Sequence, residues 1–216
     1  MQLSTDGIAL VQGLLNEQEC DDAARSIEQL QAVGVGSRRL LQETWCAALA
    51  EKVMDHPVVR AALPERARAV QCSVFEKSAA RNWLVAIHQD LSIPVAARVD
   101  HPALCGWSEK EGAHFVQPPD SVLAQLLAVR IHIDACSLAD GPLKVVPGSH
   151  ELGRVEPARA VLLGRAQGVC VPAARGDALL MRPLVLHASS KSSGTSRRRV
   201  LHFVFGPQAL PCGLAW

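Results

Sequence analysis

A histidine and an aspartate with one residue between them end an apolar run in the first half of the chain. The run is Trp83 to Ile87, and His88 and Asp90 follow it. In an extended strand, residues i and i+2 point to the same face, so an imidazole nitrogen and a carboxylate oxygen can be aimed at one point. These groups are two of the three ligands in the 2-His-1-carboxylate site that holds non-haem Fe(II) and leaves coordination positions open.

Three histidines are candidates for the remaining ligand: His150, His187 and His202. His187 ends an apolar stretch before a serine-rich segment, and Arg198 opens the next predicted strand. An arginine there can face the same cavity and bind a carboxylate through two charge-assisted hydrogen bonds. This would suit the distal carboxylate of a 2-oxo diacid whose keto-acid end chelates the metal. His150, within Pro-Gly-Ser-His, is more typical of a turn, and no such arginine follows His202.

A second His-x-Asp, formed by His132 and Asp134, competes with the first. It lies within an apolar strand and not at its end. We expect it to be a buried, hydrogen-bonded pair or an outward-facing polar stripe.

Composition limits the possible partners and the cellular compartment. The net charge is +1, so no polyanion partner is indicated, and we interpret the arginine run 197–199 as a solvated strand end. The seven cysteines are odd in number, widely spaced and without a CxxC, which favours reduced thiols in a cytoplasmic protein. We find no signal peptide and no apolar stretch long enough to cross a bilayer. We therefore expect no nucleic acid and no membrane as partners, and leave monomer or homodimer open.

The elements that must position these residues change type along the chain. After an edge strand at 7–15, Asn16 and Glu19 form a capping-box pattern before an amphipathic helix over 17–32 that Gly34 would end. Two further helices are predicted before Pro64. Beyond them the pattern predicts strands over the ranges 69–77, 83–90, 126–136, 143–146, 168–172, 178–187 and 198–205.

Short strands separated by Gly, Pro and Asp turns, with helices only in the first third, predict a mainly β fold of the sandwich or jelly-roll type. We expect a single domain over 1–216, with a helical support over about 1–66 and a jelly-roll core over about 67–208. The segment 100–121 is predicted to be a long loop, which in a compact domain is usually a lid or a binding loop.

Several ordered motifs together resemble the phytanoyl-CoA dioxygenase family of Fe(II)/2-oxoglutarate oxygenases, and the resemblance spans nearly the whole chain. They are the opening Asp6–Leu15, the run Phe75–Asp90, the segment Gly141–His150, and Gly176-Asp177 leading to Arg182–His187 with Ser189 and Arg198 beyond.

The resemblance implies a double-stranded β-helix, which is a cupin-like jelly roll with N-terminal flanking helices. It places Fe(II) on His88, Asp90 and His187, and the C5 carboxylate of 2-oxoglutarate on Arg198 with help from Ser189. With O2 as the oxidant, the implied products are succinate, CO2 and an oxidised small molecule. Related halogenases replace the metal carboxylate with a small residue, so the presence of Asp90 favours hydroxylation. The chemistry belongs to the iron, and no separate protein acid or base is assigned.

Further residues are candidates for contacts in the cavity. Lys77 and Asn82 could reach the cosubstrate, although a solvated lysine and a turn asparagine are equally plausible. The remaining candidates for substrate contacts are Trp83, Arg130, Trp107, His114 and Gln117. Arg130 is notable because a long cation within an apolar strand needs an anion or backbone partners.

Rival functions use the same residues. A non-catalytic or degenerate jelly-roll sensor would bind metal without turnover, and a zinc hydrolase could use the same two histidines and carboxylate but would leave Arg198 unexplained. A nucleic-acid oxygenase using the run 197–199 is disfavoured by the near-neutral charge. The substrate itself cannot be derived from family membership.

Overall fold

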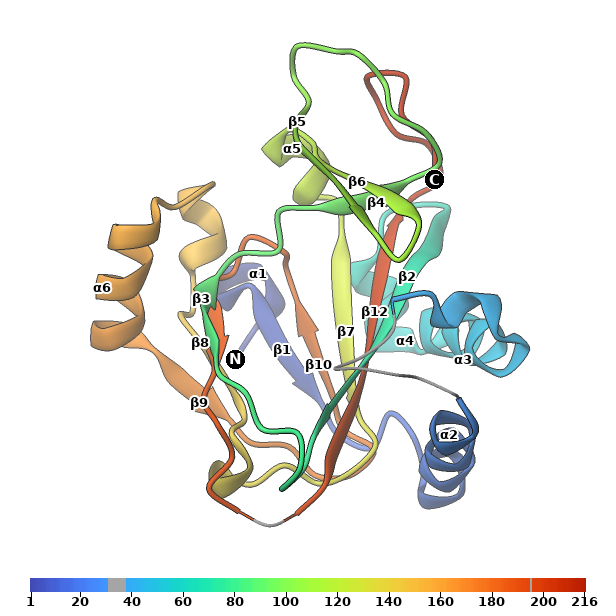
Figure 1. Cartoon of the computed structure of the whole chain (residues 1–216), viewed down its shortest axis with the longest axis vertical. Coiled ribbons are helices and arrows are strands. Elements are labelled where there is room, and N and C mark those ends of the chain that lie inside the picture. Colours follow the sequence, from blue (N-terminus) through green and yellow to red (C-terminus); the bar gives the residue numbers. More distant parts are fainter. Residues whose placement is uncertain (31–37, 195) are drawn as a thin grey trace.

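The computed structural model describes residues 1–30, 38–194 and 196–216, and its two main sheets face each other (Figure 1). The larger is a five-stranded antiparallel sheet in the order β1 (Ile8–Val11), β10 (Ala178–Met181), β7 (Leu127–His132), β12 (Arg198–Pro207) and β2 (Ala67–Lys77). The smaller has four strands in the order β3 (Val85–His88), β11 (His187–Ser189), β8 (Leu143–Val145) and β9 (Val169–Val171). This arrangement confirms the predicted jelly roll.

Strand β12 shows how the sequence separates the two faces of the larger sheet. Leu201, Phe203 and Phe205 pack into the core under the helices, whereas Arg198 and His202 line the cavity on the opposite face. All five residues are buried. Because successive side chains alternate between faces, one strand supplies both the apolar core and the polar lining.

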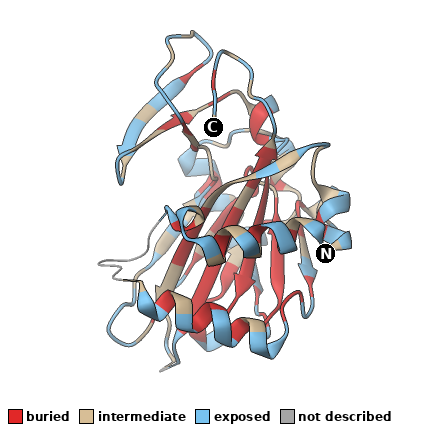
Figure 2. Ribbon diagram, turned by 90° about the vertical axis from the view of Figure 1, so that its right-hand side faces the viewer, coloured by how far each residue is buried: buried red, intermediate tan, exposed pale blue. Residues whose placement is uncertain are grey.

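Three helices pack against the outer face of the larger sheet and contribute to this core. They are α2 (Glu17–Gln29), α3 (Thr44–Asp55) and α4 (Pro57–Ala62). Figure 2 shows buried residues concentrated in the strands and exposed residues along the outward helix faces. The predicted capping box is confirmed, since Asn16 Oδ1 accepts from Glu19 N at 2.9 Å and Glu19 Oε2 accepts from Asn16 N at 3.0 Å. The predicted terminator Gly34 lies outside the described residues.

The expectation that helices are confined to the first third is wrong. Helix α6 (Pro157–Gln167) packs against β3 on the outer side of the smaller sheet (Figure 1). Pro157 occupies the first helical turn, where its fixed φ favours initiation. Only Ala160 and Gly164 are buried, so the apolar periodicity is too weak to identify this helix from the sequence.

The prediction of a long loop over 100–121 is also wrong, because most of this segment forms a hairpin. Strands β5 (Cys105–Lys110) and β6 (Ala113–Gln117) pair with β4 (Ile93–Val95) in a third sheet at one end of the molecule (Figure 1). The connecting residues Glu111 and Gly112 have φ of 52° and 73°, as a two-residue type I′ turn requires. A glutamate at the first of these positions departs from the usual Asn-Gly or Asp-Gly signal, which concealed the hairpin.

The predicted strand 178–187 is in fact two strands in different sheets. Strand β10 ends at Met181 and β11 begins at His187. Pro183 has no N–H to continue a ladder, and Arg182 N donates to Gly7 O at 2.8 Å as the chain turns. His187 therefore starts a strand of the smaller sheet. Likewise β3 ends at His88, and Asp90 follows it with its N–H donated to Pro183 O at 3.0 Å.

The remaining elements are short. They are α1 (Leu3–Asp6), α5 (Asp120–Leu123) and the 3-10 turns Leu40–Gln42, Leu138–Asp140 and Ser149–Leu152.

All seven cysteines are free. No helix of the described chain is long and apolar enough to span a membrane.

Candidate metal centre and cavity

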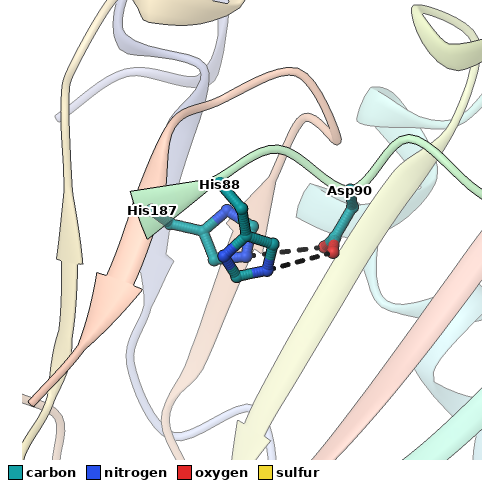
Figure 3. A group of neighbouring side chains, drawn as sticks. All are labelled: His88, Asp90 and His187. Carbon is teal, nitrogen blue, oxygen red and sulfur yellow. Dashed lines mark ion pairs between the residues drawn. The ribbon is translucent and has the colours of Figure 1, made fainter. Parts of the chain in front are cut away.

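Strand pairing brings the three predicted metal ligands together. His88, the last residue of β3, is the register partner of His187, the first residue of β11. Asp90 lies just past β3, with its carboxylate oxygens 3.7 Å from the Nε2 atoms of His88 and His187 (Figure 3). One ligand atom from each residue lies within 4.8 Å of the others. His132 and Asp134 do not join this group.

The main chain orients both imidazoles. His88 Nδ1 lies 2.8 Å from Ala86 O, and His187 Nδ1 lies 2.9 Å from Val185 O. A carbonyl can only accept, so Nδ1 is the protonated nitrogen and the Nε2 lone pair faces the site. Burial lowers the pKa of His187, which keeps the ring neutral.

Asp90 completes a donor set that suits a divalent cation. Burial opposes its ionisation, but electrostatic interactions with His187, His202, His88 and Arg130 outweigh that effect and lower the pKa of Asp90. Two neutral imidazole nitrogens and one carboxylate oxygen fit Fe(II) with open positions, and also catalytic zinc. The residues present therefore fit the implied metal.

Gln89, which lies between His88 and Asp90, connects this segment to neighbouring parts of the chain through hydrogen bonds. Its Nε2 donates to Gly153 O at 2.7 Å and to Leu184 O at 2.6 Å, and its Oε1 accepts from Val155 N at 2.8 Å. Leu184 lies on the turn that leads to His187. Gln89 thus connects the two segments that carry the ligands.

We expect Gln89→Ala to lower the free energy of unfolding by about 1–3 kcal/mol, because buried backbone groups lose their partners. Misplaced ligands should also weaken metal binding roughly 10-fold. Urea unfolding and metal titration measure the two effects. Gln125→Ala removes an exposed glutamine and serves as the matched control. An unchanged metal affinity in Gln89→Ala would restrict Gln89 to a stabilising role.

A cavity of about 590 Å³ opens beside the triad, with lining residues from both main sheets and from the hairpin. Arg198, Lys77 and Ser189 form a cationic cluster in its wall. Lys77 Nζ donates to Ser189 Oγ at 2.7 Å, and Arg198 NH1 donates to Gly141 O. Burial and the charge of Arg198 lower the pKa of Lys77 to about 8. Two adjacent buried cations without a carboxylate partner among the described residues favour an anion here.

Two of the predicted substrate contacts line the cavity. Trp83 lies beside Lys77, whose Nζ is 5.5 Å from the ring centroid. Arg130 is buried on β7 and its NH1 lies 3.2 Å from His202 Nδ1. His202, which was one candidate for the third ligand, is not part of the triad. It lies next to the triad, with its Nε2 atom 4.0 Å from Asp90 Oδ2. Its position on the cavity face of β12 follows from alternation with the core residues of that strand.

The other predicted contacts do not line this cavity. Asn82 binds the main chain of Ser192 through both ends of its amide, at 2.7 and 2.8 Å. Trp107 lies beside Arg98 in the apolar cluster at the hairpin end, and Gln117 accepts from Arg154 at 2.9 Å. His114 neighbours the lining residue Phe115 on β6.

The hairpin does reach the cavity, through residues that the sequence did not single out. Phe115 and Lys110 both line it. Alternation along β6 turns Phe115 inward and its neighbour His114 away. Without the strand register, the polar residue attracted the prediction instead of the apolar one.

The second His-x-Asp has a structural role, and its two residues serve different partners. Asp134 receives Arg199 Nε and NH2, each at 2.7 Å, and Arg199 N at 2.8 Å. Arg197 pairs with Glu28 and Glu76. The arginine run is therefore largely neutralised by carboxylates. His132 is buried, and its Nδ1 has no partner in the described chain.

His132 should make the protein sensitive to acid. Burial and the charges of Arg130 and Arg198 lower the pKa of His132 from 6.5 to about 3. Below pH 6.5, His132 binds a proton in the unfolded chain but stays neutral in the folded state. The free energy of unfolding therefore decreases as the pH falls toward 3. His132→Leu should remove up to about 1.4 kcal/mol per pH unit from that slope. Urea unfolding of both proteins between pH 7 and 4 measures it, and equal slopes would contradict the expectation.

Comparisons with known proteins agree with this fold. The model of the phytanoyl-CoA dioxygenase family (PhyH) matches residues 3–200. No curated protein sequence matches the chain significantly.

Solved structures of enzymes with this fold are similar at low identity. HygX from Streptomyces hygroscopicus, with nickel and 2-oxoglutarate bound, is 18% identical with a TM-score of 0.69, covering 95% of this chain and 84% of that one. The carbocyclase SnoK from nogalamycin biosynthesis is 16% identical with a TM-score of 0.69, and the match covers 95% of this chain and 81% of SnoK. The epimerase SnoN from the same biosynthesis is 17% identical with a TM-score of 0.68, covering 98% and 83%.

Proposed function

Because the chain belongs to the phytanoyl-CoA dioxygenase family, we propose that it is an Fe(II)- and 2-oxoglutarate-dependent dioxygenase that hydroxylates a C–H bond of a small molecule. The observation that carries the proposal is a metal-binding triad and a cationic cluster in one cavity. The products are the hydroxylated molecule, succinate and CO2. The named structural relatives support the cosubstrate, since HygX has been solved with 2-oxoglutarate bound and SnoN with Fe3+, α-ketoglutarate and nogalamycin RO.

At neutral pH the triad residues have the protonation states that metal binding requires. His88 and His187 present unprotonated Nε2 atoms because carbonyls fix their tautomers, and Asp90 is ionised. Fe(II) bound there supplies the chemistry that activates O2 toward a C–H bond, while the protein binds, orients and excludes water.

The cationic cluster orients the cosubstrate. Arg198 offers the distal carboxylate a bidentate edge, because NH1 is occupied by Gly141 O and Nε has no partner in the described chain. Lys77 adds a point charge below pH 8, and the Ser189 hydroxyl already contacts it. Binding an anion relieves the repulsion between the two cations, which makes this end of the cavity selective for a diacid.

Apolar side chains shield the reacting centre. Phe75, Trp83, Ile93 and Phe115 contribute to the lining. By displacing water they strengthen the electrostatic contacts inside the cavity and limit side reactions. They also leave room for a substrate beside the cosubstrate.

The test is succinate formation from 2-oxoglutarate by the purified protein with Fe(II), ascorbate and O2. Succinate release that requires all three components supports the proposal. A metal-binding sensor would release none. A zinc hydrolase would keep its activity when Zn(II) replaces Fe(II) and when O2 and 2-oxoglutarate are removed.

The outcome of the oxidation is tested separately, because SnoN and SnoK are described as an epimerase and a carbocyclase. Mass spectrometry of the product distinguishes these reactions. Hydroxylation adds one oxygen atom, which 18O2 labels. Ring closure removes two hydrogens, and epimerisation leaves the mass unchanged.

A further inference from the structure

Arg130 is a buried cation that forms no ion pair with the described residues, although the more distant charge of Asp90 favours its protonated form. It lies on β7, only 8% exposed, and lines the cavity. The described residues place no carboxylate within ion-pair distance of it. Its guanidinium lies 5.5 Å from the centroid of the Phe75 ring. An arginine remains charged at neutral pH, and a buried unpaired cation is costly.

The contacts of Arg130 leave its carboxylate-binding edge without a hydrogen-bond partner among the described residues. NH1 lies 3.2 Å from His202 Nδ1, and since arginine can only donate, His202 is the acceptor. Nε has no partner in the described chain, and no hydrogen bond engages NH2 there. Nε and NH2 form the edge that binds carboxylate or phosphate in a bidentate manner. Arg198 has the same edge free, so the cavity offers two such positions.

The cosubstrate cannot account for both positions, a step that rests on the proposed function. One carboxylate of 2-oxoglutarate belongs to the metal and the other to Arg198 with Lys77. Arg130 is in register with His202 on β12, four residues from Arg198. Four residues of strand correspond to about 13 Å. Arg130 therefore starts from a different position along the sheet than Arg198, although burial and the charge of Arg198 still lower the pKa of Arg130 to about 10.

The lining around this place is partly apolar, and Gln71 and Ser73, the register partners of Val204 and His202, add neutral polar groups. Leu126, Ala128, Val204 and Phe115 line the cavity together with Arg130. Asp90 is the one acidic side chain in the described lining, and its charge belongs to the metal. Lys110, over the Phe115 ring at 4.8 Å, adds positive charge on the hairpin side. The wall thus combines one deep cation with apolar surface and two neutral polar side chains.

From these observations we propose that Arg130 binds an acidic group of the substrate, so that the substrate class is small organic acids with an apolar body. His202 orients the guanidinium from one side and Phe75 supports its face. The acidic group, carboxylate or phosphate, fills the Nε–NH2 edge. The apolar body then extends toward the hairpin formed by β5 and β6.

The experiment is calorimetric and needs no turnover. The protein is loaded with Mn(II) and N-oxalylglycine, an unreactive analogue that fills the cosubstrate position. 4-Phenylbutyrate and phenyl phosphate are then titrated, each against an uncharged counterpart, 4-phenylbutyramide and benzyl alcohol. We expect at least one acid to bind about 10-fold or more tighter than its counterpart, and Arg130→Met to weaken that acid by roughly 10- to 100-fold. The preferred acid separates a carboxylate from a phosphate source.

Controls separate Arg130 from general charge and from the cosubstrate. Arg60→Met removes an arginine from an exposed surface pair and should keep the acid preference. If Arg130→Met does not fold, Arg130→Lys keeps the charge without the bidentate edge and should lose part of the preference. The inference is overturned if wild type shows no preference for acids, if the folded Arg130 variant keeps the full preference, or if it weakens N-oxalylglycine equally. Failure of wild type to bind N-oxalylglycine would instead contradict the proposed function.

Discussion

Replacing Asp90 with alanine should abolish 2-oxoglutarate turnover and weaken Fe(II) binding by more than about 100-fold. Removing the carboxylate leaves only the two imidazoles of the group whose ligand atoms lie within 4.8 Å of one another. Changes to residues that merely support metal ligands already cost about 10- to 100-fold, so loss of a ligand should cost more. Anaerobic metal titration and succinate release in the absence of substrate measure the two effects. His88→Ala should behave in the same way.

Matched variants distinguish a ligand from a merely nearby group. Asp55→Ala removes an exposed carboxylate paired with Arg60 and should leave metal binding unchanged. His132→Leu removes the histidine of the second His-x-Asp and should do the same at pH 7.5. Metal affinity within a few-fold of wild type in folded Asp90→Ala would exclude the triad. Loss of affinity in His132→Leu would show that the wrong motif had been assigned.

The candidate metal centre was predictable because it depends on local spacing and strand ends. His88 and Asp90 are close in sequence, and His187 was distinguished by the Arg198 that follows it. The jelly roll was predictable from short strands separated by turns. The residues that complete the cavity, such as Phe115, depend on which face of a strand points inward. That face is set by the register of β6 against β4 and β5, which no local pattern specifies.

The errors have the same physical origin. The apolar stretch 178–187 looks continuous, yet Pro183 ends the ladder and the chain crosses from one sheet to the other. This crossing places His187 opposite His88. Helix α6 buries too few residues to show a period, since its burial depends on β3, which only the tertiary fold supplies. Tertiary contacts therefore decided what local sequence preference left ambiguous.

Arg198→Met should raise the dissociation constant of 2-oxoglutarate by roughly 100-fold or more, because the distal carboxylate loses a buried bidentate partner. Fe(II) binding without cosubstrate should stay unchanged, since Arg198 is no part of the triad. The charge-transfer absorption of the Fe(II)–2-oxoglutarate chelate measures the affinity anaerobically. Arg198→Lys keeps a charge without the bidentate edge and should fall in between, while Arg60→Met should match wild type.

A cosubstrate without the distal carboxylate makes the assignment specific. 2-Oxovalerate retains the keto acid but has no second carboxylate, so wild type should bind it far more weakly than 2-oxoglutarate. In Arg198→Met that discrimination should largely disappear, because the lost interaction is the one that 2-oxovalerate never makes. Full discrimination in the variant would assign the distal carboxylate to another cation.

Replacing Arg198 and replacing Arg130 should then affect the binding of different ligands. Arg198→Met should lose N-oxalylglycine binding, and Arg130→Met should keep it while losing the preference for acids. This pattern follows from two separate bidentate edges on one wall, one beside Lys77 and the other beside His202. If each variant weakened both ligands equally, the two guanidinium groups would form a single anion site, and only one carboxylate-bearing molecule would occupy it.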